Sequence, residues 1–309
     1  MELMVAMAIT TIIVTVLVSI TSIALDTWNR SRSELRAARQ AKGMLDLISR
    51  DFEAFVSRRG NSNEWLSAVT ETKEIGDKLK STNRSKLMFF SAVTDRYNGQ
   101  LYGPDNIQDT SDDPPGGDVS FVAYELDYKD PFTGSRSSDF STFVLNRLVV
   151  DPDDAFRDMM GRTALADTLS TTPTPPVKGP KVSPKDKKYS EQLSHSTNFV
   201  VENIYQFTVT FHVEVLDSTT TPPVTKIESV TMGKSATTFS VGGKEIVTIP
   251  PNPRLSAGRL VAVEISTTVI SDFGVDQARR RDLSDPTKRA AFLAQNSYQY
   301  TKLVQLPSM

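Results

Sequence analysis

The N-terminal apolar run is the feature that most constrains this chain. Residues 3–25 carry no charged side chain, and Glu2 immediately precedes them. Because an α-helix rises ~1.5 Å per residue, about 20 apolar residues cross the ~30 Å hydrocarbon core of a bilayer. A carboxylate deep in that core costs roughly 2.5–3.5 kcal/mol, so Glu2 needs a partner if it is buried there. The sequence therefore predicts one transmembrane helix over residues 1–25.

The helix is expected to continue well beyond the membrane. The first glycine is Gly43 and the first proline is Pro104, so neither helix breaker falls at the membrane exit. Apolar residues then recur at steps of three and four, which is the spacing of one helical face. They are Leu35, Ala38, Ala41, Leu45, Ile48, Phe52 and Phe55. The other face carries Arg30, Arg32, Arg36, Arg39, Lys42, Arg50 and Asp51. We expect one unkinked rod from Leu3 to about Val56, amphipathic over residues 26–58.

Composition limits the possible functions. The 309 residues include 35 basic and 37 acidic side chains, so no global positive field recruits nucleic acid, and no nucleic-acid partner is expected. The absence of cysteine excludes disulfides, thiolate metal sites and cysteine nucleophiles. Only His195 and His212 supply imidazole, which disfavours histidine catalysis and metal ligation. We expect no cofactor, no metal site and no enzymatic activity.

The N-terminus raises two further questions. A cleaved signal peptide fits the N-terminus poorly. No basic segment precedes the apolar run, and the run is longer than the apolar region of a signal peptide, which usually has about 7–15 residues. The second question is the orientation of the helix. The arginines that follow Leu25 place the C-terminal domain in the cytoplasm by the positive-inside rule.

Most of the remaining chain is typical of antiparallel strands. The alternation of apolar and polar residues is clearest over 203–215, where Phe207, Val209 and Phe211 share one face. Other strands are expected at 85–92, 119–128, 142–150, 259–270 and 298–306, with two strand segments in 227–248. Gly242-Gly243 indicates a hairpin turn, and Ser284-Asp285-Pro286 indicates the start of a helix that ends near Asn296.

These elements predict an α+β fold, a long N-terminal helix packed on an antiparallel sheet. Residues 59–309 form the β-rich globular domain. A proline- and lysine-rich insertion near 151–197 is expected to be flexible surface. The helix stripe through Leu45, Ile48 and Phe52 is expected to cover the sheet face that bears Phe207, Val209, Phe211 and Val263.

Several segments resemble a known family. ELMVAMAITTIIVTVLVS (residues 2–19) resembles the N-terminal segment of type IV pilins and type II secretion pseudopilins, in which a glutamate opens a hydrophobic helix; Glu2 matches that glutamate. LRAARQAKGMLDLISRDFEAFV resembles the helix of J-type minor pseudopilins. FVAYELDY, FVLNRLVVDP, VVENIYQFTVTFHVEV and RLVAVEISTTVIS follow in the order of that family's sheet. The pilin-like C proteins of the Verru/Chthon cassettes share this order.

The resemblance implies a pilin-like fold, with the Glu2 carboxylate paired to the N-terminal amine of a neighbouring subunit. It implies as partners other pilin-like subunits, membrane lipid, an inner-membrane assembly platform and a prepilin peptidase that acts on the full-length precursor. In that family a basic leader ending in glycine precedes the glutamate, whereas here Met1 does, so we expect a late start codon or a truncated sequence. A restored leader would place the C-terminal domain in the periplasm, the orientation we favour.

The remaining candidate residues have simpler interpretations. Glu2 can also be a headgroup-level acid favoured by the helix dipole. The acidic loop lacks the spacing of an EF-hand, so calcium binding by its residues is disfavoured. Those residues are Asp105, Asp109, Asp112, Asp113 and Asp118. His195 and His212 are expected at the surface, and the run Arg279–Arg281 is expected to be a solvated face.

Two classes of function remain open. The first is a structural, membrane-anchored subunit that joins or initiates a pseudopilus or pilus. The second is a membrane-anchored binding or sensor domain. An anchored hydrolase is a weaker third hypothesis, because no catalytic motif is present. The coding sequence upstream of Met1 would separate the first two, since an in-frame basic leader ending in glycine favours the pilin-like interpretation.

Overall fold

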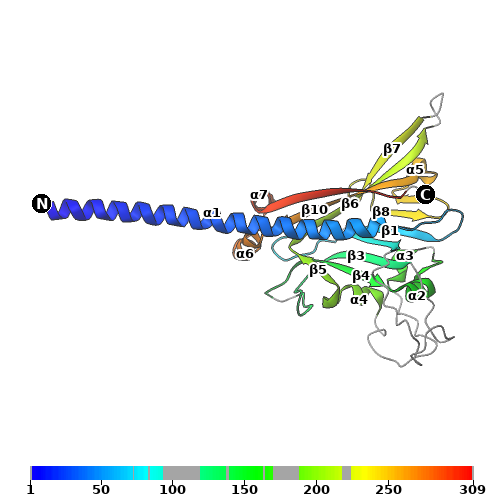
Figure 1. The fold of residues 1–309 in the computed structure, drawn as a ribbon, viewed down its shortest axis with the longest axis horizontal. Helices are drawn as coiled ribbons and strands as arrows, with labels where there is room; N and C mark the ends of the chain where they lie inside the picture. The colour runs from blue at the N-terminus through cyan, green and yellow to red at the C-terminus, as the bar shows by residue number, and fades with distance from the viewer. Residues whose placement is uncertain are drawn as a thin grey trace.

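A single long helix dominates the molecule. The computed structural model describes residues 2–71, 73–82, 84–92, 119–136, 139–162, 164–169, 188–217 and 224–307. Helix α1 (Glu2–Glu53) has 52 residues. Its N-terminal half projects from the domain as a straight rod, and its C-terminal half lies along the domain (Figure 1). The prediction of one continuous helix through residues 24–36 is confirmed, with its end at Glu53, three residues before Val56.

The described strands form one mainly antiparallel sheet. The central order is β11-β10-β6-β2-β1-β8-β9; β3 pairs with β2 and β4, β5 with β4, and β7 with β6. One parallel bridge joins Arg84 of β2 to Phe207 of β6. The strands are β1 (Glu64–Glu71), β2 (Arg84–Ser91), β3 (Ser120–Lys129), β4 (Thr142–Val150), β5 (Phe199–Glu202), β6 (Ile204–Asp217), β7 (Val224–Thr231), β8 (Thr238–Gly242), β9 (Ile246–Ile249), β10 (Arg259–Ile270) and β11 (Ser297–Gln305).

Most strand predictions are confirmed. The strands expected at 85–92, 142–150 and 259–270 are β2, β4 and β10, and the hairpin at Gly242-Gly243 joins β8 to β9. Helix α7 (Pro286–Asn296) begins with its proline, and Asp285 caps it by accepting a hydrogen bond from Thr287 N. Strands β1 and β5 and helix α6 (Asp272–Arg280) were not predicted. The fold is α+β, as predicted.

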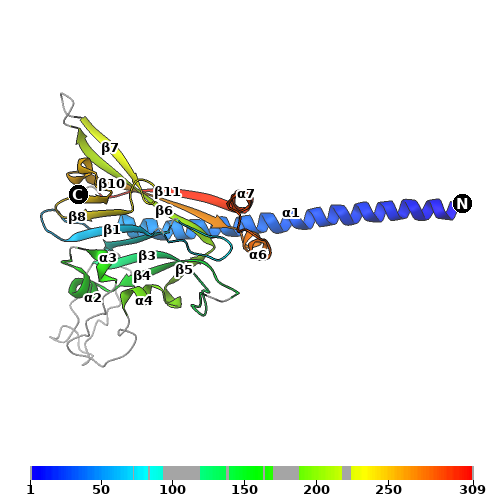
Figure 2. The same ribbon diagram turned by 180° about the vertical axis from the view of Figure 1, so that it is seen from behind.

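Short helices cover part of the sheet. They are α2 (Pro152–Asp154), a π-helical turn (Ala155–Met159), α3 (Leu165–Thr168) and α4 (Tyr189–Leu193), followed by a 3-10 turn (Ser196–Asn198). They contact β1, β3 and β4 (Figure 2). Leu165, Tyr189 and Leu193 are buried, which differs from the expectation of an exposed insertion at 151–197. The centre of that segment, 170–187, lies outside the described residues. A further short helix, α5 (Pro253–Ser256), precedes β10.

The packed half of α1 covers the other face of the sheet. The ladder register aligns Val209, Ile265 and Lys302 in one row and Phe211, Val263 and Val304 in the next. This face is turned toward α1, because Lys302 Nζ lies 2.7 Å from the carboxylate of Asp46 on the helix. Leu45, Ile48 and Phe52 share one buried core with Phe207 and the apolar residues of the two aligned rows. The predicted packing of the stripe is therefore confirmed. The Phe52 ring also stacks on Phe89 of β2, with centroids 4.3 Å apart.

Two residues of α1 do not follow the predicted faces. Leu35, assigned to the apolar stripe, is 57% exposed, and Asp51, assigned to the charged face, is 1% exposed. At the N-terminal end of the packed half, the buried line runs instead through Ser33 and Ala37. There α1 packs against α6, and Phe273 N donates to Ser33 Oγ at 3.1 Å. Small side chains allow this close approach, so the stripe shifts around the helix.

Candidate functional site

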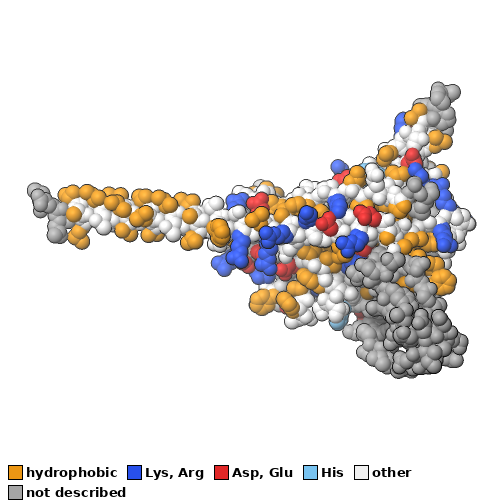
Figure 3. All heavy atoms as spheres, viewed as in Figure 1, with side chains coloured by type: hydrophobic (Ala, Val, Ile, Leu, Met, Phe, Trp, Pro, Cys, Tyr) orange, Lys and Arg blue, Asp and Glu red, His pale blue; other side chains and the backbone are white. Residues whose placement is uncertain are grey.

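The projecting half of α1 is the most unusual surface of the described structure. Every residue from Met4 to Arg32 is exposed. In space-filling view this part is an apolar rod (Figure 3). Its most apolar 18-residue window has a mean hydropathy of 2.4, and none of that window is buried. By length and composition α1 can cross a membrane once. Glu2 lies in the first turn, but its side chain is outside the described part, so its predicted assembly role stays a prediction.

Most hydroxyl groups on this rod are satisfied within the helix. Six of them donate to the backbone carbonyl four residues earlier, at 2.8–2.9 Å. They belong to Thr10, Thr11, Thr15, Ser19, Thr21 and Thr27. A satisfied hydroxyl costs little in hydrocarbon, and small side chains let two helices approach closely. This surface is therefore suited both to lipid and to a neighbouring helix.

Two polar contacts hold the helix against the domain at the base of the rod. The guanidinium of Arg30 donates to the carbonyl of Gln295, at the end of α7, at 3.0 Å. Arg36 forms a 3.0 Å ion pair with Asp272, the first residue of α6. Helices α6 and α7 thus hold α1 where it leaves the domain, on opposite sides of it in both ribbon views.

A buried ion pair fixes the other end of α1. Arg147 of β4 is 6% exposed, and its Nε lies 2.7 Å from Asp51 Oδ2 and 2.9 Å from the hydroxyl of Tyr124. Tyr124 in turn donates to Asp51. Burial raises the pKa of Tyr124 well above its ordinary value, so the phenol stays protonated and can donate. Burial opposes the charge on Arg147, but the hydrogen bond to Asp51 raises its pKa.

Sequence reasoning missed this triad. Asp51 lies three residues after Ile48 and four before Phe55, which places it within the apolar stripe. That position could have indicated that Asp51 is buried. A charge within a stripe indicates a buried partner, because an isolated buried charge is very costly. The triad links α1 to β3 and β4 and fixes the rotation of the helix on the sheet.

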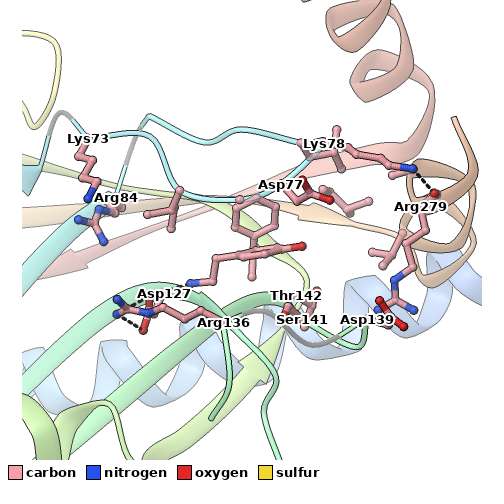
Figure 4. A pocket seen from close by; sticks show the side chains of 18 of the residues that line it. Lys73, Asp77, Lys78, Arg84, Asp127, Arg136, Asp139, Ser141, Thr142 and Arg279 are labelled. Atoms are coloured by element: carbon pink, nitrogen blue, oxygen red, sulfur yellow. Dashed lines mark hydrogen bonds and ion pairs between the residues drawn. The ribbon is translucent and has the colours of Figure 1, made fainter. Parts of the chain in front are cut away.

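The domain also has a charged cleft of about 940 Å³ beside the β1–β2 connection. Figure 4 shows Arg136 and Asp127 paired on one wall, with 3.0 Å between their charged atoms. On the opposite side Lys78 donates to the backbone carbonyl of Arg279. Tyr128 and Phe143, which also line the cleft, pack edge to face. Binding pockets are usually mostly apolar with few polar groups, so a cleft with so many charged residues is an unusual ligand site.

The other candidate residues from the sequence lie apart from one another. His195 is exposed and caps a short 3-10 turn by accepting from Thr197 N. His212 lies on the open face of the sheet, with Nδ1 2.8 Å from Ser229 Oγ and Nε2 3.5 Å from the carboxylate of Glu264. Arg279–Arg281 are exposed, as expected.

Gly242-Gly243 forms a turn, as predicted, and a Cβ on Gly243 would collide with the backbone oxygens of Asn61 and Arg58. The acidic loop 105–118 is outside the described residues. In the part that is described, no group of three or more His, Asp or Glu residues could hold a metal ion.

Comparisons with known proteins give limited information. No family model matches the chain, and no curated protein matches it. Among solved structures, the chain is similar to a type IV-like pilin from Thermus thermophilus. The identity is 10%, the TM-score is 0.31, and the alignment covers 88% of this chain and 97% of that chain. A TM-score this low carries no argument about function, so the functional argument rests on α1.

Proposed function

We propose that the chain is a non-enzymatic, membrane-anchored subunit that assembles with other pilin-like subunits through the projecting half of α1. The carrying observation is the division of one unbroken helix into a fully exposed apolar half and a half buried in its own domain. Before assembly, lipid covers the apolar half. On assembly, the same surface transfers from lipid to the corresponding helices of neighbouring subunits, and the rigid rod carries the domain with it.

The contacts at the base of the rod favour assembly over simple anchoring. An anchor needs only a membrane span, and a flexible linker to the domain would suffice. Here Arg30, Ser33 and Arg36 dock the helix on α6 and α7 immediately beyond the apolar run. The domain therefore has a fixed height and orientation on the rod. Such a fixed geometry is what a repeating assembly requires, because each subunit must meet the next in the same way.

The finer assignment is a minor pseudopilin-like subunit of a type II secretion-like pseudopilus or pilus-like filament. In this proposal the domain is periplasmic, the helix lies in the inner membrane, and the assembly platform and prepilin peptidase are partners. Glu2 pairs with the N-terminal amine of a neighbour, since a carboxylate among apolar helices is costly without a positive partner. The resemblance of residues 2–19 to the pilin N-terminal segment supports this assignment.

Cysteine cross-linking in membranes tests the proposal. The chain has no cysteine, so a single Val14→Cys substitution on the rod gives one thiol. We expect cross-links between this thiol and the matched helix position of a neighbouring subunit. Thr225→Cys is the control, because it is exposed on β7, which projects away from α1 in both ribbon views. A chain that remains uncross-linked at Val14→Cys in the presence of its partners is an anchored monomer.

The Glu2→Ala variant tests the polar contact separately. Behind a cleavable leader it should still insert, because removing a charge makes insertion easier. Cross-linking through Val14→Cys should fall, because the carboxylate no longer pairs with the neighbour's amine. If the Val14→Cys chain cross-links equally with and without Glu2→Ala, Glu2 is only an acid at the level of the lipid head groups.

The second candidate function is a membrane-anchored binding or sensor domain, and the charged cleft is the observation that favours it. Its walls contain paired charges such as Arg136 with Asp127 and Arg84 with Glu71. A ligand would have to replace these pairs. Arg136→Ala separates the two functions, because it should abolish ligand binding in a sensor and leave rod cross-linking unchanged in an assembly subunit.

A further inference from the structure

Basic side chains gather on α1 where it leaves the domain. Residues 26–42 contain five basic and two acidic side chains, whereas the whole chain has 35 basic and 37 acidic residues. Figure 3 shows the Lys and Arg side chains massed next to the apolar rod. We call Arg30, Arg32, Arg36 and Arg39 the basic collar. Helix α6 packs beside the collar through its N-terminal part and places Asp272 and Asp276 near Arg32, Arg36 and Arg39.

The part of the collar nearest the apolar run, Arg30 and Arg32, lies at the height of lipid head groups if α1 crosses a bilayer. If the apolar run ends at Leu25, Trp28 lies ~4.5 Å, Arg30 ~7.5 Å and Arg32 ~10 Å farther along the helix. Each head-group layer is about 5–8 Å thick. Side chains on a helix tilt toward its N-terminus, which here is toward the bilayer, so both arginines reach that layer. Trp28 is 68% exposed, as an interfacial tryptophan would be.

Two arginines of the collar, Arg30 and Arg32, form no ion pair with the described residues of the domain. Arg36 is neutralised by Asp272. The bond from Arg30 goes to a backbone carbonyl, so its charge is not compensated by that contact. Arg32 is exposed and, among the described residues, makes no ion pair or side-chain hydrogen bond. Arg30 and Arg32 therefore form no ion pair with the described residues, although Asp26 and Glu34 lie on the same stretch of α1.

We propose that the basic collar binds the phosphate groups of anionic phospholipids. Arg30 and Arg32 contact the phosphates directly, and Arg39, which lies farther along the helix, adds weaker attraction. The proposal rests on α1 crossing a bilayer, as in the proposed function, but it does not require assembly. Its consequence is mechanical. Bound lipid fixes how far α1 enters the membrane, and with it the height at which the domain meets a neighbour.

Lipid selectivity of the full chain tests the proposal. The chain is incorporated into phosphatidylcholine nanodiscs that contain trace spin-labelled phosphatidylglycerol or phosphatidylcholine, and the protein-bound fraction of each label is measured. We expect preference for phosphatidylglycerol that falls in 1 M salt, where the Debye length is about 3 Å. Arg32→Gln should reduce the preference by ~5-fold, because each basic residue near an anionic surface contributes about that factor.

Arg50→Gln is the matched control. Arg50 is also an exposed arginine of α1, but it lies ~27 Å farther from the membrane than Arg32, so its removal should leave the lipid preference unchanged. Equal preference in the Arg32→Gln and Arg50→Gln variants would overturn the proposal. The proposal would also be overturned if Arg32→Gln reduced cross-linking through Val14→Cys and left the lipid preference unchanged. That result would mean that the collar binds an acidic surface of a neighbouring protein. Failure of the chain to enter nanodiscs would instead refute the membrane anchor itself.

Discussion

The two halves of α1 belong to one continuous helix, but one half is exposed and the other is packed on the domain. From Met4 to Arg32 the helix is fully exposed, and from Ser33 onward one of its faces is buried. The first half presents a continuous apolar surface, and none of its faces packs on the domain. The second half needs a defined rotation, because Phe52 and Asp51 must meet Phe89 and Arg147. The first surface can accept many neighbours, whereas the second fits one sheet.

This difference predicts that stability and assembly are separable along a single helix. Substitutions in the packed half should change the free energy of unfolding of the domain. Substitutions in the projecting half should change association and leave the domain intact. All unfolding measurements below use the full chain in lipid nanodiscs, so that the rod stays covered while the domain unfolds.

Phe52→Ala is expected to have the largest effect. Phe52 is fully buried, and its ring stacks on Phe89. Truncation of a buried phenylalanine to alanine removes apolar contacts and leaves a cavity, which costs roughly 3–5 kcal/mol. Denaturant unfolding followed by circular dichroism would measure the loss. A midpoint equal to that of the unmodified chain would show that the packed half of α1 contributes little to the domain.

Asp51→Ala should be nearly as damaging, for an electrostatic reason. It leaves the guanidinium of Arg147, which is 6% exposed, without its carboxylate. Breaking a buried ion pair by removing one partner costs roughly 3–5 kcal/mol.

The double variant Asp51→Leu/Arg147→Met provides the control for Asp51→Ala. It removes both charges and fills the space with apolar side chains, so stability should largely recover. If the double variant were as unstable as Asp51→Ala, loss of packing would explain the effect and the ion pair would not.

The comparison of the two halves also shows which features of the structure could be predicted from the sequence. Length and composition predicted the rod, because an uncharged apolar run of 23 residues, 3–25, is typical of a membrane-spanning helix. Strict alternation identified β6, and the Asp285-Pro286 start identified α7. Periodicity could not place Leu35, because the face of a helix that becomes buried depends on what packs there, in this case α6. The spacing of Asp51 within the stripe could have indicated burial but could not identify Arg147 of β4 as its partner. Strand β1 was missed because both of its faces are buried, so it lacks alternation.

Asp46→Ala should have a small effect with a distinctive pH dependence. Asp46 is exposed, and the hydrogen bond from Lys302 lowers the pKa of its carboxyl. A group with a lowered folded pKa adds stability above its unfolded pKa and loses it as the pH falls. The variant should therefore be slightly less stable at neutral pH and indistinguishable from the parent in strong acid. A difference that persists in acid would point to the helix contact and not to the charge.

The smallest effect on stability is expected for Leu17→Ala, which forms a matched pair with Leu45→Ala. Both replace leucine by the best helix former on the same helix, but Leu17 is 57% exposed and Leu45 is 5% exposed. Leu45→Ala should cost roughly 2–5 kcal/mol. Leu17→Ala should stay within ~0.5 kcal/mol of the parent, as surface substitutions usually do. It should instead reduce Val14→Cys cross-linking, because a neighbouring helix loses packing area. Equal effects of the two substitutions on unfolding would mean that the projecting half is part of the folded domain, and the division of α1 would then be wrong.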